Sequence, residues 1–478
     1  MIQILAKIKL EKEAITAICL IALFSAFLLI NFTLGFNLFF YIIIALAGLI
    51  LSFIYPRGGL YALIALTLIF AKFFTLQSFW INEVEYKLYL ADIIMLGMLF
   101  SIWLSLVGRK IKLQLKLADV LLACFMALTA VYFLISIFYL DGDFLTAFSS
   151  FKNYIFYPLL YFATLFLIDS KEQLQRFFKF IIFGSIIIIP FIIYGLIVGQ
   201  GLWTYITPLS TQGSRILDFD HAFYLCLISL AGLSYILFKK TKLNQLWYIL
   251  LPIFAIGIAG SLMRHLWIAM FAALIFLYII ICKEHKEIFR KLIAKYIAAA
   301  VMILSVIILL INLFPFASFS QDMLETQDRL VNRAVSVVDA SDSSIAWRST
   351  VWKGVWKEYK DNIFLGLGFG QKIFIDMGYY RDYVEVRNIH NSWLAVFVQT
   401  GILGFIILIS FYFNLIKNVF KQKAKDINLS VLRLAGLGIA VFCLIAFLFQ
   451  PYLEANFFNI IFWINLGLMR RFYEGFAS

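Results

Sequence analysis

Long apolar runs follow one another along most of this chain, and they restrict the fold more than any other feature. Each run has roughly 15 to 24 residues, about the length that a helix needs to cross a hydrocarbon layer of ~30 Å. We therefore predict an all-α integral membrane protein with about 12–14 transmembrane helices. The candidate spans lie near residues 14–34, 37–55, 59–79, 88–107, 116–139, 153–169, 177–199, 221–238, 247–260, 266–282, 294–315, 393–415, 430–449 and 456–470.

The composition excludes a soluble protein. Apolar residues make up 63% of the chain and charged residues only 14%, whereas a soluble domain is close to half apolar and a quarter charged. The first run is too long, and too poor in small residues at its far end, for a cleaved signal peptide, so we expect it to be retained. The five cysteines lie in or beside apolar runs without a C-x-x-C spacing, which indicates packing residues.

The formal net charge of +13 follows the order of the spans. Basic segments such as "GRKIKLQLK" and "KNVFKQKAK" occupy every second gap between spans, and the intervening gaps are poor in lysine and arginine. Basic residues collect on the cytoplasmic side of bacterial membrane proteins, so we expect both termini in the cytoplasm. The basic excess is mostly a topology signal, and we expect membrane lipids but no nucleic acid as partners.

One gap on the outer side is a loop of about seventy-five residues, far above the ~12 of most connections, which indicates a functional segment. The chain then divides into N-terminal spans (1–200), central spans with two outer-face arginines (201–315), this loop (316–392) and C-terminal spans (393–478).

Two stretches of the long loop have a recognisable pattern. In "SSIAWRSTVWKGVWKEYK" three tryptophans share much of one side of a predicted amphipathic helix, which we expect to lie flat on the membrane surface. In "FLGLGFG" the glycines at 366, 368 and 370 predict a turn or a close backbone approach.

Three polar residues stand out on the outer side. Arg215 precedes a span, Arg264 lies between two spans with almost no loop, and His390 opens the apolar run after the long loop. A charged residue at membrane depth is costly and usually marks a site or a buried partner. The alternatives are a snorkelling side chain for Arg264, a surface cation for Arg215, and a helix-start residue beside the caps Asn391 and Ser392 for His390.

The motifs around these residues are similar to those of a known family. "SLMRH" between two spans, "WRSTVWKGVWKEYKDNIFLGLGFG" in the long loop and "HNSWLAVFVQTGILGF" at the next span resemble the O-antigen ligase and O-antigen polymerase family in order and sidedness. The resemblance covers roughly residues 205 to 415. The chain departs from the family pattern at Met263, where the family often has serine, and in having about two more spans than is usual for its ligases.

The resemblance implies an inverting, metal-independent glycosyltransferase of the bacterial inner membrane, with its active site on the periplasmic face and no cofactor. The donor would be a glycan on undecaprenyl diphosphate, and the acceptor a sugar hydroxyl of a growing glycan or of the lipid A core. Guanidinium groups bind diphosphate bidentately and stabilise the charge of a leaving group, which is the role expected of Arg215 and Arg264. A neutral imidazole accepts a proton near neutral pH, so His390 is the expected base.

Three further outer-face residues are expected to support the site. Glu454, in "QPYLEANFF", is placed to orient His390 or to pair with an arginine, the alternative being a plain loop charge. Arg387 and Arg348 are candidates for contacts with the diphosphate or the glycan.

Two rival interpretations stay open on the sequence. Asp141 and Asp143 have the D-x-D spacing of metal-dependent glycosyltransferases, although Asp-Gly-Asp is also a common turn sequence. The number of spans also suits a flippase of lipid-linked oligosaccharides, but we find no internal repeat of the kind that transporters show. Between polymerase and ligase we slightly favour a polymerase.

Overall fold

The computed structural model is helical almost throughout, as the apolar runs predict. It divides into two units: unit 1 combines residues 1–188, 350–423 and 447–478, and unit 2 combines residues 189–349 and 424–446. The structure describes residues 2–81, 84–108, 114–204, 215–238, 243–313, 343–422 and 426–475, so residues 316–342 of the expected loop lie outside the described part.

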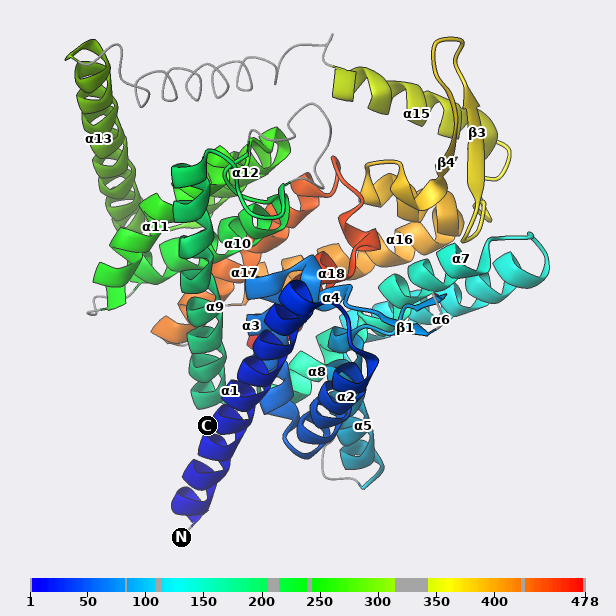
Figure 1. The fold of residues 1–478 in the computed structure, drawn as a ribbon, viewed down its shortest axis with the longest axis horizontal. Coiled ribbons are helices and arrows are strands. Elements are labelled where there is room, and N and C mark those ends of the chain that lie inside the picture. The colour runs from blue at the N-terminus through cyan, green and yellow to red at the C-terminus, as the bar shows by residue number, and fades with distance from the viewer. Residues whose placement is uncertain are drawn as a thin grey trace. The chain divides into compact units, whose positions relative to one another are not determined.

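Every candidate span falls on a helix (Figure 1). In unit 1 these are α1 (Ile2–Leu34), α2 (Leu38–Ile54), α3 (Pro56–Phe70) with the short α4 (Lys72–Thr75), α5 (Leu90–Val107), α6 (Leu117–Phe138), α8 (Leu159–Leu167), α16 (Ser392–Lys421) and α18 (Asn456–Glu474). In unit 2 they are α10 (Phe219–Phe238), α11 (Leu243–Gly260), α12 (Arg264–Ile280), α13 (Lys283–Leu313) and α17 (Ile427–Ala446), while α9 (Lys171–Val198) runs through residues of both units.

The remaining elements of the described chain lie between these helices. They are β1 (Phe79–Ile81) with β2 (Val84–Tyr86), α7 (Phe144–Phe151) with the π-helix η1 (Lys152–Phe156), α15 (Ser343–Tyr359), β3 (Lys372–Asp376) with β4 (Arg381–Glu385), η4 (Val386–Asn388) and η5 (Tyr452–Glu454). Among the described residues, seven helices are long and apolar enough to cross a membrane, and four shorter apolar helices accompany them. The all-α membrane class is therefore confirmed.

One end of unit 1 is held by buried ion pairs. The guanidinium of Arg470, on α18, contacts both carboxylate oxygens of Asp119, on α6, with Nη2 at 2.9 Å from Oδ2. Both side chains are almost fully buried. Arg57, which is partly exposed, contacts the buried Glu13 at 3.1 Å and the more exposed Asp169 at 3.0 Å. Glu13 precedes the first candidate span and Arg57 lies in a gap, while Asp119, Asp169 and Arg470 lie at the span ends that the charge pattern assigns to the cytoplasm.

The opposite end of unit 1 joins the gaps that the charge pattern assigns to the outer side. Asp143, between α6 and α7, donates its N–H to the carbonyl of Gly370 in the long loop at 3.1 Å. The hydroxyl of Ser392, at the start of α16, donates to the carbonyl of Gln450 at 2.8 Å. The loop around Gly370, the start of α16 and the gaps 139–143 and 450–455 thus meet at one end of unit 1.

The topology prediction concerns this separation of ends. A cysteine at Tyr379, which is 80% exposed at the tip of the β3–β4 hairpin, should react with a membrane-impermeant maleimide in spheroplasts. Green fluorescent protein fused after Ser478 should fluoresce, because the charge pattern predicts a cytoplasmic C-terminus. The unsubstituted chain, with its native cysteines, is the control for labelling. Labelling of the hairpin only after permeabilisation would contradict the model.

Candidate functional site

His390 lies at the junction of the long loop and α16, and its backbone is strained. Its φ angle is +54°, in the left-handed region that costs a non-glycine residue on the order of 1–3 kcal/mol and that recurs at functional sites. The side chain of Asn391 accepts the N–H of Leu394 at 3.0 Å and caps α16. Asn391 is therefore the cap of α16, as the sequence predicts, and His390 is the residue that precedes it.

Contacts on either side of His390 hold its backbone. On the preceding residue, the carbonyl of Ile389 accepts the indole N–H of Trp352, on α15, at 2.8 Å. On the following side, Ser392 bonds through its hydroxyl to Gln450. The helix predicted in "SSIAWRSTVWKGVWKEYK" is confirmed as α15, and the indole N–H of Trp352 bonds to the protein. The expected position of this helix on the membrane surface stays a prediction.

The glycines of "FLGLGFG" form the predicted turn. Gly366, Gly368 and Gly370 all have φ angles between +74° and +83°. A Cβ on Gly366 would lie only 2.5 Å from the backbone nitrogen of Gly401 in α16. Since side chains neither fit this contact nor readily adopt this conformation, glycine is required at position 366.

The loop around these glycines pairs with an interruption in α16, which we call the α16 break. Helical geometry is lost at Gly401, where φ is +64°. The N–H of Leu367 donates to the carbonyl of Val398 at 2.8 Å, and the N–H of Ile402 donates to the carbonyl of Ile363 at 2.9 Å. Non-helical backbone inside a membrane span is tolerated where protein satisfies its polar groups, and here the long loop does so.

A buried carboxyl group lies next to this arrangement. Glu454, on η5, accepts hydrogen bonds from the Tyr154 hydroxyl at 2.6 Å, the Gln399 amide at 2.8 Å and the Ser150 hydroxyl at 3.0 Å. We call these four residues the Glu454 cluster. Because Gln399 stands two residues before Gly401, the α16 break fixes the direction of its side chain toward Glu454.

Burial raises the pKa of Glu454 above its ordinary value, and the charge of Arg387 opposes this shift. Glu454 therefore binds a proton more tightly in the folded chain than in the unfolded chain. Between the ordinary and the raised pKa, folding stability falls as the pH rises, because only the unfolded state has ionised. The positive charge of Arg387 acts on Glu454 as an electrostatic influence, and the expected pairing of Glu454 with an arginine stays a prediction.

Arg387 contributes an unsatisfied donor to the same end of unit 1. Its Nε donates to Glu385 at 3.0 Å, while its buried Nη1 has no hydrogen-bond partner among the described residues. Leaving a charged donor buried without a partner is costly unless a ligand or water completes it. Arg387 thus has a guanidinium nitrogen available for an anionic or hydroxyl-rich ligand three residues from His390.

Arg215 and Arg264 come together in unit 2. Arg215 is buried, and its Nη1 donates to the sulfur of Met263, the residue that precedes Arg264, at 2.8 Å. The segments are also joined by the N–H of Ile216, which donates to the carbonyl of Gly260 at 3.1 Å. Leu262, in the tight turn before α12, has a φ of +56°. Met263, the departure from the family pattern, is therefore a partner of Arg215.

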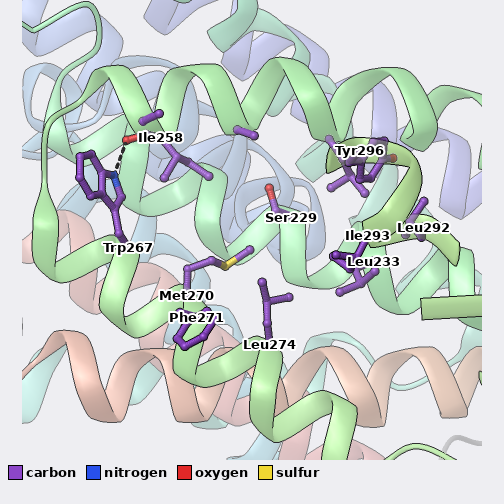
Figure 2. Close-up of a pocket in the computed structure, with 13 residues that line it drawn as sticks. Ser229, Leu233, Ile258, Trp267, Met270, Phe271, Leu274, Leu292, Ile293 and Tyr296 are labelled. Atoms are coloured by element: carbon purple, nitrogen blue, oxygen red, sulfur yellow. Dashed lines mark hydrogen bonds between the residues drawn. The ribbon is translucent and has the colours of Figure 1, made fainter. Parts of the chain in front are cut away.

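An apolar cavity of about 560 Å³ lies among α10, α11, α12 and α13 of the same unit (Figure 2). Trp267, one turn after Arg264, lies at one end and donates its indole N–H to the carbonyl of Ile258 at 3.1 Å. Two buried hydroxyls, on Ser229 and Tyr296, have no hydrogen-bond partner among the described residues. The lining is otherwise almost wholly hydrocarbon, a surface that suits a lipid chain.

The remaining candidates from the sequence are Arg348 and the D-x-D sequence at Asp141 and Asp143. Arg348 lies on α15 and is half-buried. Asp143 of the D-x-D sequence caps α7 by accepting the N–H of Thr146 at 2.9 Å, and these hydrogen bonds lower its pKa. Within the described residues, no group of three His, Cys, Asp or Glu side chains is placed to hold a metal ion.

These positions can now be compared with known proteins. Residues 247–409, from α11 to the α16 break, match the family model described as O-antigen ligase. Over these residues, about a third of the chain, the protein is similar to the O-antigen ligase family. The resemblance in the motifs is thereby confirmed, and the protein is a membrane enzyme of the glycosyltransferase type. The match includes Arg264, Arg348, Arg387 and His390 but neither Arg215 nor Glu454. No match was found among curated proteins.

Sequence reasoning missed the partners of Glu454 and of Arg215. Ser150, Tyr154 and Gln399 look like ordinary residues of apolar runs, and Met263 looks like a departure from a motif. Only Gln399 carried a signal, as a carboxamide inside an otherwise apolar span, because a polar group at membrane depth requires a partner.

The glycine prediction tests the pairing at the α16 break. Gly366→Ala adds left-handed strain of about 1–2 kcal/mol and a clash with Gly401, so it should lower the thermal unfolding midpoint and abolish glycan transfer. Gly378→Ala is the matched control, since Gly378 has a φ of +82° but nothing within 4 Å of an added Cβ. Equal unfolding midpoints for the two variants would show that the close approach is unimportant.

Proposed function

We propose that this protein transfers a glycan from a polyprenyl diphosphate, of the undecaprenyl type, to a sugar hydroxyl on the periplasmic face of the bacterial inner membrane. The reaction inverts the anomeric carbon and needs no metal. The single observation that carries the proposal is the strained His390 beside Arg387 and the Glu454 cluster, at the start of α16 within the residues that match the O-antigen ligase family. A left-handed backbone is unfavourable for histidine, and such strain clusters at functional sites, which supports a function for the imidazole of His390.

The proposed step assigns a role to each group. The acceptor oxygen attacks the anomeric carbon as the imidazole of His390 takes its proton, and the bond between that carbon and the phosphate oxygen breaks. The diphosphate leaves with the electron pair and gains negative charge. Arg215 and Arg264 stabilise this charge by bidentate contacts, and Arg387 and Arg348 contact the diphosphate or the glycan. Glu454 orients His390 or pairs with an arginine of the site.

The cavity beside Arg264 supports a lipid-linked donor. It starts one helical turn from the arginine and is lined by apolar side chains (Figure 2). A polyprenyl chain in this cavity would place its diphosphate near the turn that carries Met263 and Arg264. The enzyme-type family match favours this transferase over a flippase.

The acceptor is proposed to be a growing glycan chain, which makes the protein a polymerase; a ligase would instead use the lipid A core. Deletion of the gene distinguishes the two on a gel of the surface polysaccharide. A ladder that collapses to one repeat unit indicates the polymerase. Loss of glycan from lipid A, with accumulation of lipid-linked polymer, indicates the ligase.

The arginine prediction separates charge from geometry. Arg264→Ala and Arg215→Ala should abolish transfer, and the lysine variants should also be impaired, because lysine lacks the planar fork that grips a diphosphate. Transfer in membranes of matched expression is the measurement. Arg290→Lys on α13, at an exposed position, is the control and should keep full activity. Full activity in the alanine variants would remove both arginines from the site.

The histidine prediction uses a substitution that preserves the backbone. Asparagine tolerates the left-handed conformation, so His390→Asn should keep the fold and donor binding but lose the base, with transfer reduced roughly 10²- to 10⁴-fold. His285→Asn, at the basic end of α13, is the control. Near-native transfer by His390→Asn, at equal protein level, would leave His390 as a structural residue.

A further inference from the structure

The β3–β4 hairpin has one buried face and one exposed face. Its strands pair antiparallel with Phe374 opposite Tyr383. Ile373, Ile375 and Val384 are buried, and the side chain of Ile375 would lie within 2.8 Å of a Cβ added to Gly354 on α15. Close packing on α15 therefore fixes the orientation of the hairpin, and the alternate side chains must point outward.

Three cross-strand pairs make up the exposed side, which we call the hairpin face. Its residues are Lys372 opposite Glu385, Phe374 opposite Tyr383, and Asp376 opposite Arg381. The rings of Phe374 and Tyr383 are 5.0 Å apart between centroids, and these residues remain 49% and 66% exposed. An exposed pair of rings is thus flanked on both sides by opposed acidic and basic groups.

This combination matches the chemistry of a sugar chain. The C–H face of a pyranose packs on the electron-rich face of an aromatic ring, and its hydroxyls take charge-assisted hydrogen bonds from flanking carboxylates and guanidinium or ammonium groups. Asp376 is suited to accept such bonds, because the N–H of Gly378 and the charge of Arg381 lower its pKa. An anionic lipid surface would instead favour an excess of basic residues, whereas the charges of the hairpin face are balanced.

The hairpin face leads directly to the proposed site. β4 ends at Glu385, whose carboxylate accepts hydrogen bonds from Arg387 and Asn388, both at 3.0 Å. His390 follows two residues later. We propose that the hairpin face binds the acceptor glycan and directs its terminal hydroxyl toward His390. The binding site stands on the hairpin itself, while its assignment to the acceptor rests on the proposed function.

Binding is tested first without reference to activity. The full-length protein in lipid nanodiscs is incubated with oligosaccharides released by mild acid from the surface polysaccharide of the source cells. Hydrogen exchange of residues 372–385 is then followed by mass spectrometry. Slower exchange with the oligosaccharide is the expected result. Unchanged exchange at saturating concentration would overturn the proposal, and so would protection by the nanodisc lipid alone with no further effect of the sugar.

The variants then separate the rings from the fold of the hairpin. Phe374→Val combined with Tyr383→Thr keeps residues that favour strands but removes both rings. It should raise the KM for the acceptor roughly 10-fold or more at unchanged kcat, and Phe374→Tyr should retain the native KM. Tyr139→Thr is the control, because Tyr139 is 82% exposed but lies at the end of α6.

The two proposals fail in different ways. If the double variant leaves both KM and the exchange protection unchanged, the hairpin face does not bind the acceptor, whatever His390 does. If protection by the oligosaccharide is lost in the double variant while His390→Asn transfers normally, the hairpin face binds glycan and the catalytic assignment fails.

Discussion

The pairing of the long loop with the α16 break determines where the functional groups of unit 1 lie. A membrane-spanning helix cannot leave backbone groups unsatisfied. Residues 363–368 of the loop supply the hydrogen bonds that the interruption at Gly401 requires. The same pairing directs Gln399 to Glu454 and ties the loop that ends in His390 to α16. The contact requires glycine on both sides. The glycines of "FLGLGFG" in the loop and of "TGILG" in α16 therefore serve the same backbone pairing.

Buried charge in unit 1 serves two different purposes at its two ends. Arg470 and Asp119 form a buried ion pair, and the hydroxyl of Tyr161 donates a further hydrogen bond to Asp119 at 2.6 Å. Removing one member of such a pair costs about 3–5 kcal/mol, so this end is built for stability. At the other end Glu454 has neutral hydrogen-bond partners and Arg387 keeps an unsatisfied nitrogen. An incomplete arrangement is expensive to maintain, which is why it indicates a binding role.

The sequence predicted those parts of the fold that local physics decides. Apolarity and length located the helices. The glycines of "FLGLGFG" predicted a turn, because no other residue adopts positive φ angles as readily as glycine. The resemblance located His390 and Arg264, which the family match then included. The partners of Glu454 could not be predicted, because Tyr154 lies 300 residues away in the chain and carries no local mark among 24 tyrosines. The contact of Arg215 with Met263 could not be predicted either, because a thioether is rarely considered a partner for a guanidinium.

The α16 break also imposes an order on the insertion of the chain into the membrane. The loop residues that satisfy Val398 and Ile402 precede α16 in the sequence, so on the predicted topology they are exported before α16 enters the bilayer. The interrupted helix therefore meets its partner at the moment of insertion, from the chain segment just translocated, and the closure is short. A loop placed after α16 would have left these backbone groups exposed to lipid until its own export. Assembly of this end of unit 1 thus proceeds from the loop inward, with the segment that carries His390 settled before the last two helices are made.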